Sequence, residues 1–533
     1  MPTLLLHNGP IYTLDAVGAV AEALAIRDGR ILAVGALADV RAAAGPRAEP
    51  IDLAGRAAIP AITDAHVHLG YHALARRSVL LDDIDDFELA LDTIAQAAAR
   101  LPAGAWLQGR GWDHTLWGGR WPTAADLDRV IGDRPALLLR KDGHSAWASS
   151  AALAIAGIDD ATPDPAGGRF RRDDADRQTG ILLEQAIGLV RQHIPASDTE
   201  QRLAATIEAI AEAHSYGMVG MHIPTAATPG DGWLVMHDTM RLRERGALKL
   251  RCLNYFGEDG LDAALALGLR SGFGDAWVKL GGLKLFADGA LGSETALMLA
   301  PYEGTENSGI AVLAKAQLND LIGRAIGGGL SVMVHAIGDG ANRHVLDAIE
   351  RALRATPGFA SPIPNRVEHC QLLAPSDMPR FAELGIIASM QPIHCTQDMD
   401  VAQRLWGGRC SGAYAWRSLA RLGTTLAFGS DAPVESLNPW RSVHAAVTRQ
   451  RADGRPDGGW YPDETLTVEQ ALRGFTNGPA AAAGESHRQG QLAAGFLADI
   501  AVLSADPFAI APAELAQIAA AITILDGEVV YGR

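Results

Sequence analysis

The chain has 533 residues, 48% of them hydrophobic and 20% charged, which allows a large apolar core and excludes global disorder. It carries 46 Lys and Arg residues against 62 Asp and Glu residues, so its net charge is −16. That balance argues against a nucleic acid or an anionic membrane surface as partner, because both favour a basic face. At ~150 residues per domain the length predicts roughly three domains, although one α/β barrel can take up most of it.

The cysteines and the amino terminus indicate the compartment. None of the cysteines forms a CxxC pair, which argues against a disulfide scaffold or a thiolate zinc knuckle; they are Cys252, Cys370, Cys395 and Cys410. The first residues, MPTLLLHNGP, lack the basic lead and long apolar run of a signal peptide. No stretch approaches the ~18 apolar residues of a membrane span. We therefore expect a cytoplasmic protein with reduced thiols.

Both ends of the chain read as short β-strands. Near the amino end, Asp28-Gly29 separates two apolar runs, which is typical of a β-hairpin. Three further short apolar runs lie within residues 499–531. We expect residues 1–58 and 485–533 to form one small composite β-sandwich domain. The alternative is two unrelated β extensions.

The middle of the chain alternates apolar runs with amphipathic segments. Helical patterns are clearest at residues 201–214, 261–270, 341–354 and 468–475. Between such segments lie eight strand candidates, at residues 59–63, 218–223, 248–255, 277–286, 330–334, 366–368, 386–390 and 424–428. This alternation predicts an α/β fold, a distorted (β/α)₈ TIM barrel over residues 59–484. The long gap after the first strand predicts an inserted α/β subdomain at about residues 71–195, where several tryptophans gather.

A pair of histidines follows the first strand candidate, in the sequence DAHVH. Alternation along a strand places His66 and His68 on the same side. Two neutral imidazoles there can bind one metal ion. Histidines that only hydrogen-bond within the fold give the same pattern, so the pair alone does not establish a site.

Other strand candidates also end in side chains that bind metals. His335, His369 and Asp431 each follow an apolar run directly. A barrel places its active face at the carboxyl ends of its strands, so these side chains would meet the two histidines of DAHVH. The sequence therefore predicts a metal site built from four histidines and one aspartate.

A lysine lies inside the fourth strand candidate. Lys284 would be costly to bury as an ammonium ion, and burial lowers the pKa of such an amine and makes it reactive. With CO₂ it can form a carbamate that bridges two metal ions. The alternative is a buried ion pair between Lys284 and Asp288. Alternation places these two residues on one side of the strand and the neighbouring Lys279 on the other.

These positions together resemble the amidohydrolase superfamily. More specific phrases resemble its YtcJ-like branch, which includes N-substituted formamide deformylases. They are LKLFADGALGSETA, VHAIGDGAN, RVEHCQLL, SMQP and GSDAPVESLNPW in the barrel, and GRGWDHTLW, RKDGHSAWASSAAL and TGILLEQA in the insertion. The resemblance covers nearly the whole chain. It is specific for the branch and weak for the substrate.

The resemblance implies a binuclear centre of divalent metal ions, two Zn²⁺ per chain. His66 and His68 would bind the more buried ion, His335 and His369 the second, and carbamylated Lys284 would bridge them. Relatives often carry an acidic residue where this chain has His222. We assign His222 no ligand role.

The resemblance also implies the reaction. Asp431 would bind metal and act as the base, with a metal-bound hydroxide as nucleophile. We expect an amidohydrolase that cleaves a non-peptide C–N bond in a small molecule similar to an N-substituted amide or formamide. The alternatives are a deaminase or an ester or lactone hydrolase with the same site, and a non-catalytic regulatory barrel protein. A homodimer is expected from the family.

Several polar and aromatic residues within the quoted phrases are candidates for substrate contact. They are Trp112, Asp113, His144, Glu184, Asp288, Gln391 and His394. A tryptophan can equally fill a core, and the polar residues can bind neighbouring loops. Cys370 directly follows His369, so alternation turns it away from the metal site and predicts a packing role.

Overall fold

The computed structural model describes residues 2–532 except 77, 83, 103, 142–144, 166–167, 196–197 and 226–230. It divides into two compact units, Met1–Leu69 with Ile207–Arg533, and Gly70–Thr206. Among the described residues, no helix combines the length and apolar character needed to cross a membrane.

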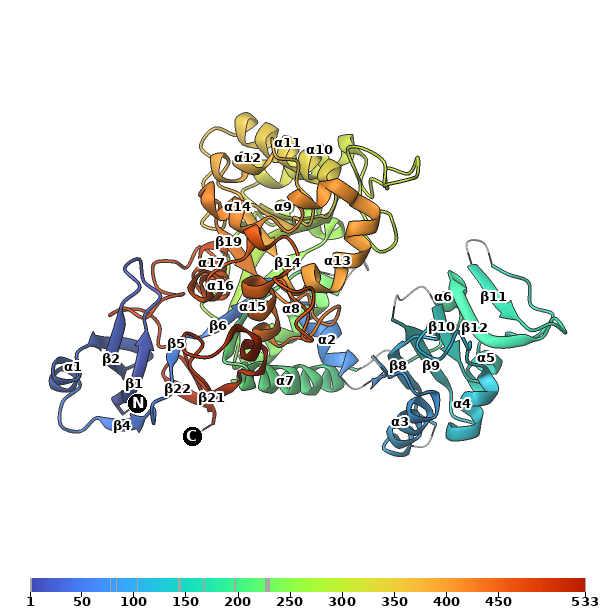
Figure 1. Ribbon diagram of the computed structural model, residues 1–533, viewed down its shortest axis with the longest axis horizontal. Helices are drawn as coiled ribbons and strands as arrows, with labels where there is room; N and C mark the ends of the chain where they lie inside the picture. The colour runs from blue at the N-terminus through green and yellow to red at the C-terminus, as the bar shows by residue number, and fades with distance from the viewer. Residues whose placement is uncertain are drawn as a thin grey trace. The chain divides into compact units, whose positions relative to one another are not determined.

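The larger unit contains a parallel eight-stranded sheet that nearly closes into a barrel, which confirms the predicted α/β barrel. Its strands are, in order, β6 (Ile62–Asp64), β13 (Met218–Ile223), β14 (Arg251–Phe256), β15 (Val278–Phe286), β16 (Ser331–Ala336), β17 (Arg366–His369), β18 (Ile387–Met390) and β19 (Leu426–Phe428). Just past the first strand, the Ala65 N–H donates to the Phe428 carbonyl of the last, at 2.9 Å. Helices connect these strands and lie around the outside of the sheet (Figure 1).

The helices of this unit follow the barrel strands along the chain. They are α7 (Thr199–Ser215), α8 (Asp231–Glu244), α9 (Leu261–Ala266), α10 (Lys315–Gly327), α11 (Asp339–Ala355), α12 (Met378–Glu383), α13 (Pro392–Trp406), α14 (Trp416–Arg421), α15 (Pro439–Thr448), α16 (Val468–Phe475) and α17 (Asn477–Ala482), with 3₁₀ turns at Glu258–Gly260, Gly407–Gly412, Pro462–Glu464 and Pro512–Gln517. The helix expected at residues 261–270 was predicted too long, since Gly268 turns left-handed at φ +68° and the helix ends before it.

The first predicted strand, residues 59–63, is in fact two strands in two sheets. The Ala61 N–H donates to the Asp499 carbonyl, whereas the next residue, Ile62, donates to the Gly217 carbonyl, both at 2.9 Å. The chain therefore passes here from the sheet of the two termini to the barrel. Apolar patterning cannot show this change, because both strands are largely buried.

Strands from both ends of the chain form one sheet, with the order β22-β21-β20-β5-β1-β2-β3 and β4 paired with β1. Figure 1 draws the blue amino-terminal strands beside the red strands β21 and β22. Asp28 and Gly29, both at positive φ, form the tight turn between β2 and β3. The elements are β1 (Leu4–Tyr12), β2 (Val20–Arg27), β3 (Arg30–Gly35), α1 (Leu37–Ala44), β4 (Glu49–Asp52), β5 (Ala58–Pro60), β20 (Ile500–Leu503), β21 (Ala520–Leu525) and β22 (Glu528–Tyr531).

The smaller unit has its own mixed sheet, with the order β11-β12-β10-β9-β8-β7. Trp112, Trp117 and Trp147 lie in its core, and their ring N–H groups donate to the backbone carbonyls of Leu138, Ile84 and Thr123. Its elements are β7 (Val79–Leu80), α3 (Phe87–Ala99), β8 (Leu107–Trp112), α4 (Ala124–Ile131), β9 (Ala136–Arg140), β10 (Ser145–Ala148), α5 (Ser150–Ile155), β11 (Gly168–Arg172), β12 (Gln178–Glu184) and α6 (Ala186–Arg191), and α2 (Leu69–Ala75) leads into it.

Candidate metal centre

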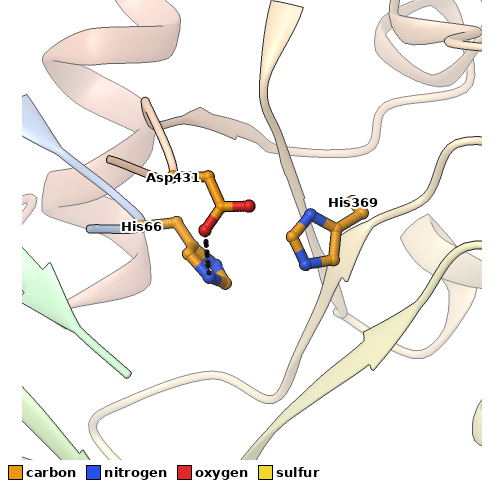
Figure 2. Close-up of side chains that lie close together, drawn as sticks. All are labelled: His66, His369 and Asp431. Carbon is orange, nitrogen blue, oxygen red and sulfur yellow. Dashed lines mark ion pairs between the residues drawn. The ribbon is translucent and has the colours of Figure 1, made fainter. Parts of the chain in front are cut away.

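Three side chains from the carboxyl ends of different barrel strands meet in one buried cluster. His66 follows β6, His369 ends β17, and Asp431 follows β19. One ligand atom from each lies within 4.8 Å of the other two. Figure 2 shows the Asp431 carboxylate directed at the His66 ring, with the His369 ring opposite. The His66 Nε2 and Asp431 Oδ1 atoms are 3.4 Å apart. This is the arrangement of side chains that a metal ion needs.

Two further predicted ligands border this cluster. His68 Nε2 lies 3.3 Å from Asp431 Oδ1. The His335 ring lies beside the His369 ring, with the two centroids 4.5 Å apart. The strand ends thus bring together the four histidines and the aspartate that the sequence singles out.

Lys284 extends from β15 into the barrel and is buried, at 2% exposure. Its Nζ atom has no hydrogen-bond partner in the described part of the chain and lies 4.6 Å from the Phe286 ring centroid. Burial lowers the pKa of this amine to about 8. An amine that is buried, unpaired and readily deprotonated can react with CO₂, and the carbamate so formed would supply oxygen ligands.

Strained backbone holds two of these residues in place. His369 has φ +72° and Asp431 has φ +59°, in the left-handed region that costs a non-glycine residue about 1–3 kcal/mol. The Asp431 N–H donates to the His66 carbonyl at 2.7 Å, and the Cys370 N–H to the Ala336 carbonyl at 3.2 Å. Bonds to neighbouring strand ends therefore stabilise the strained turns, which is common at functional sites.

Asp64 and Gly429 fix the first histidine of DAHVH. The buried Asp64 carboxyl accepts the backbone N–H of His66 at 2.9 Å and of Ser430 at 3.0 Å. Burial raises the pKa of Asp64 to about 7. A Cβ atom on Gly429 would lie 2.4 Å from the His66 nitrogen, so only glycine fits there. These contacts tie the ends of β6 and β19 together.

The electrostatics of the cluster suit a divalent cation. Burial lowers the pKa of His66 to about 4 and of His335 to about 3, and holds that of His369 well below its ordinary value. Burial alone would raise the pKa of Asp431, but His66 and the neighbouring imidazoles hold it well below its usual range. At neutral pH the cluster therefore offers neutral imidazoles and a carboxylate, the donors that zinc prefers.

The Asp288 carboxylate binds backbone groups of neighbouring loops. Among the described contacts it forms no ion pair with Lys284, which was the alternative to a reactive amine. The carboxylate accepts the backbone N–H groups of Leu297, Ile337 and Gly338 at 2.9–3.0 Å. Burial raises the pKa of Asp288 to about 7. Because these bonds occupy the carboxylate, its observed role is to hold the loops after β15 and β16.

Gln391 and His394 lie next to the cluster, at the start of α13. The Gln391 Oε1 atom accepts a hydrogen bond from His369 Nδ1 at 2.8 Å, which leaves His369 Nε2 available to a metal. His394 Nε2 lies 3.7 Å from Asp431 Oδ2. Gln391 thus orients a candidate ligand, and His394 stands beside the candidate base.

The remaining substrate-contact candidates belong to the smaller unit. Trp112 is completely buried in the core of this unit, which agrees with the core-filling role that the sequence leaves open for a tryptophan. The Asp113 carboxylate pairs with Arg140 at 2.7 Å and accepts the Thr115 N–H at 3.0 Å. Glu184 ends β12 and is exposed, and His144 lies outside the described residues. Substrate contact by these residues stays a prediction.

His222 and Cys370 are both buried beside the candidate ligands. The His222 Nδ1 atom accepts a hydrogen bond from the Arg366 guanidinium at 2.9 Å, so this nitrogen is occupied by an arginine. Cys370 is completely buried, and burial raises the pKa of its thiol well above the ordinary value. An inert, packed thiol is the result.

Sequence reasoning missed Arg366 and Glu368, although both lie in the quoted phrase RVEHCQLL. Both are completely buried inside the barrel, and Glu368 Oε2 accepts a hydrogen bond from His66 Nδ1 at 2.5 Å. The available signal was a pair of opposite charges at i and i+2 in an apolar strand, which places both on the same side.

Comparisons with known proteins agree with this geometry. A model described as the amidohydrolase family matches residues 49–531. The chain is 34% identical to the protein LONG AFTER FAR-RED 3 of Arabidopsis thaliana, over 94% of this chain and 87% of that protein. It is 33% identical to YtcJ of Bacillus subtilis, over 99% of both, and 29% identical to an N-substituted formamide deformylase of Arthrobacter pascens, over 100% of this chain and 99% of that enzyme.

A solved structure is similar over nearly the whole chain. It is an uncharacterized metal-dependent hydrolase from Pyrococcus furiosus, with a TM-score of 0.78 and 29% identity, over 95% of this chain and 100% of that one. The predicted resemblance to the YtcJ-like branch is thereby confirmed.

Proposed function

Because the chain belongs to the amidohydrolase family, we propose that it is a metal-dependent hydrolase of a non-peptide C–N bond in a small N-substituted amide or formamide. The observation that carries the proposal is the cluster of His66, His369 and Asp431, with ligand atoms within 4.8 Å of one another. The substrate class rests on the similarity to the formamide deformylase of Arthrobacter pascens.

The residues present fit a centre of two divalent ions, for which we propose zinc. His66 and His68 would hold one ion, His335 and His369 the other, and carbamylated Lys284 would bridge them. The unpaired Lys284 Nζ atom supports this assignment. A buried amine without a hydrogen-bond partner destabilises the fold, and a functional role explains why it is present. When bound, such ions lower the pKa of water and polarise a carbonyl group.

Asp431 is the candidate base. Its pKa is held well below the usual range, so it is a carboxylate at neutral pH and can accept the proton of an attacking water at an oxygen. The same carboxyl group can then deliver that proton to the nitrogen that leaves as an amine. The Nε2 atoms of His66 and His68 lie 3.4 and 3.3 Å from Asp431 Oδ1, so this oxygen faces the candidate ligands.

Product analysis of the purified protein tests this proposal. A panel of N-alkyl and N-aryl formamides and acetamides is incubated with the zinc-loaded protein, and amine and acid are quantified separately. Equal amounts of amine and carboxylic acid are expected. Release of ammonia from a retained ring would instead favour a deaminase, and turnover of esters or lactones alone would favour the corresponding hydrolase. Protein that binds no metal and turns over nothing would favour a regulatory barrel protein.

The net charge of −16 supports a small-molecule substrate and argues against a nucleic-acid partner. We keep the cytoplasmic location and the homodimer as parts of the proposal, the former because the thiols of Cys252, Cys370, Cys395 and Cys410 are free.

A further inference from the structure

The barrel interior below the candidate ligands is ionic, whereas a TIM barrel is normally filled there by branched apolar side chains. Arg366 and Glu368 are each at 0% exposure. The Arg366 Nε atom donates to Glu368 Oε1 at 2.6 Å, and its Nη2 atom to Glu368 Oε2 at 3.1 Å. The pair is therefore bidentate, the geometry in which an arginine fixes a carboxylate most firmly.

Arg366 is itself held from several sides. Its Nη2 atom donates to the Ala65 carbonyl at 2.7 Å and to the Ser389 hydroxyl at 2.5 Å, and its Nη1 atom donates to His222 Nδ1 at 2.9 Å. These partners lie just after β6, in β18 and in β13. The guanidinium thus joins four strands of the barrel and leaves the position of Glu368 little freedom.

The other face of Glu368 meets a candidate metal ligand. Its Oε2 atom accepts a hydrogen bond from His66 Nδ1 at 2.5 Å. A neutral imidazole has one N–H and one lone pair, and a carboxylate can only accept. The proton is therefore held on Nδ1, and the lone pair is placed on Nε2, the atom that faces Asp431 at 3.4 Å.

This support distinguishes His66 from the other candidate ligands. His369 donates to the amide oxygen of Gln391, at 2.8 Å, and His335 to the carbonyl of Gly289, at 2.9 Å. The His68 Nδ1 atom has no hydrogen-bond partner among the described residues. Among the four described histidines, His66 makes the shortest contact with a carboxylate, since His68 Nε2 lies 3.3 Å from Asp431 Oδ1 and His335 Nε2 lies 3.5 Å from Asp288 Oδ1.

We propose that Glu368, clamped by Arg366, is a positioning residue that fixes His66 as an Nε2 ligand and strengthens the metal position that His66 shares with His68. The inference rests on the proposed function only in requiring a metal at that position. A carboxylate behind a ligating imidazole fixes the ring and raises its basicity, and loss of such a partner weakens metal binding about 10–100-fold.

The test compares zinc affinities of metal-free protein by competition with a chromophoric chelator. Glu368→Gln is expected to weaken one of the two zinc sites by about 10–100-fold and to leave the other unchanged. Glu368→Asp, which keeps a carboxylate, should recover part of that loss. Gln391→Leu is the matched variant, because it removes the acceptor behind His369 and should weaken the other site. Asp377→Asn is the control, because Asp377 pairs with Arg343 and Arg380 outside this network and its loss should change neither affinity.

A second measurement needs no variant. The ring ¹⁵N shifts of metal-free wild-type protein are expected to show His66 protonated at Nδ1 and bare at Nε2. A proton on Nε2, or Glu368→Gln with wild-type affinity at both sites in folded protein, would overturn the inference. Wild-type protein that binds no zinc would overturn the proposed function and the inference with it. Zinc binding that Glu368→Gln leaves intact would overturn the inference alone.

Discussion

The tryptophan core of the smaller unit and the strand ends of the barrel both bury large side chains with polar atoms. The two regions differ in whether those polar atoms have hydrogen-bond partners. In the smaller unit, Trp112, Trp117 and Trp147 each donate their ring N–H to a backbone carbonyl. In the barrel, Lys284 Nζ and His68 Nδ1 are buried without a hydrogen-bond partner in the described chain. A buried polar atom without a partner costs about 1–3 kcal/mol. The difference is the one expected between a core that serves stability and the metal site that we propose.

The largest effect is expected from the candidate base. Asp431→Asn removes the proton acceptor and should lower kcat/KM for a hydrolysed amide by about 10²–10⁴-fold. Steady-state kinetics on zinc-loaded protein measure this. Asp377→Asn is the control, since Asp377 pairs with Arg343 and Arg380 away from the cluster and should leave kcat/KM nearly unchanged. Equal activity of Asp431→Asn and wild type would refute the assigned role.

The second prediction concerns the tryptophan core of the smaller unit, where the ring N–H groups are hydrogen-bonded. Trp112→Ala removes a completely buried ring and its bond to Leu138, and should lower the free energy of unfolding by about 3–5 kcal/mol. Chemical denaturation measures the loss, and Trp121→Ala, at a partly buried ring, should lose less. The zinc content of folded Trp112→Ala protein should stay at the wild-type value. A fall in zinc content while the fold persists would contradict a purely structural role for this core.

The third prediction tests the unpaired amine. Lys284→Met replaces a buried amine that has no hydrogen-bond partner in the described chain. The free energy of unfolding of the metal-free variant should therefore be about 1 kcal/mol higher than that of metal-free wild type. The same variant should lose the zinc that depends on a carbamate. Lys279→Met is the matched control, because Lys279 forms an ion pair with Glu485 and its loss should destabilise. If Lys284→Met were clearly less stable, the amine would have a partner that the structure does not show.

The smallest effect concerns pH. Burial lowers the pKa of His66 to about 4 and that of His335 to about 3, from an ordinary value of 6.5. Since a depressed pKa keeps a histidine neutral to lower pH, zinc should stay bound down to about pH 5 and be released on further acidification. Dialysis at stepped pH followed by elemental analysis measures this. Half-release near pH 6.5 would mean that the ligand histidines titrate as exposed ones do.

The positions of the candidate ligands could be predicted from the sequence because they lie at or just after the ends of apolar strands. His335, His369 and Asp431 each stand at a strand end, and a barrel brings strand ends to one face. Arg366 and Glu368 are harder to assign, since buried opposite charges conflict with the apolar pattern that marks a strand, and only their i, i+2 spacing indicates a pair on one side.

Other features depend on contacts between distant segments. The chain changes sheets at Ala61 because Asp499, far along the sequence, accepts its N–H. The role of Asp288 likewise depends on Leu297, Ile337 and Gly338, which meet its carboxylate only in the folded barrel. Periodicity reports which face of a strand is buried, but it does not report which segments supply the partners.

We propose that the strand ends of the barrel hold a binuclear metal centre bridged by carbamylated Lys284. The most direct measurement is the metal content per chain by elemental mass spectrometry, on protein purified without chelator and with bicarbonate present. We expect about two divalent ions per chain in wild type and a sharp fall in Lys284→Ala. A content near zero that added zinc and bicarbonate fail to restore would contradict it.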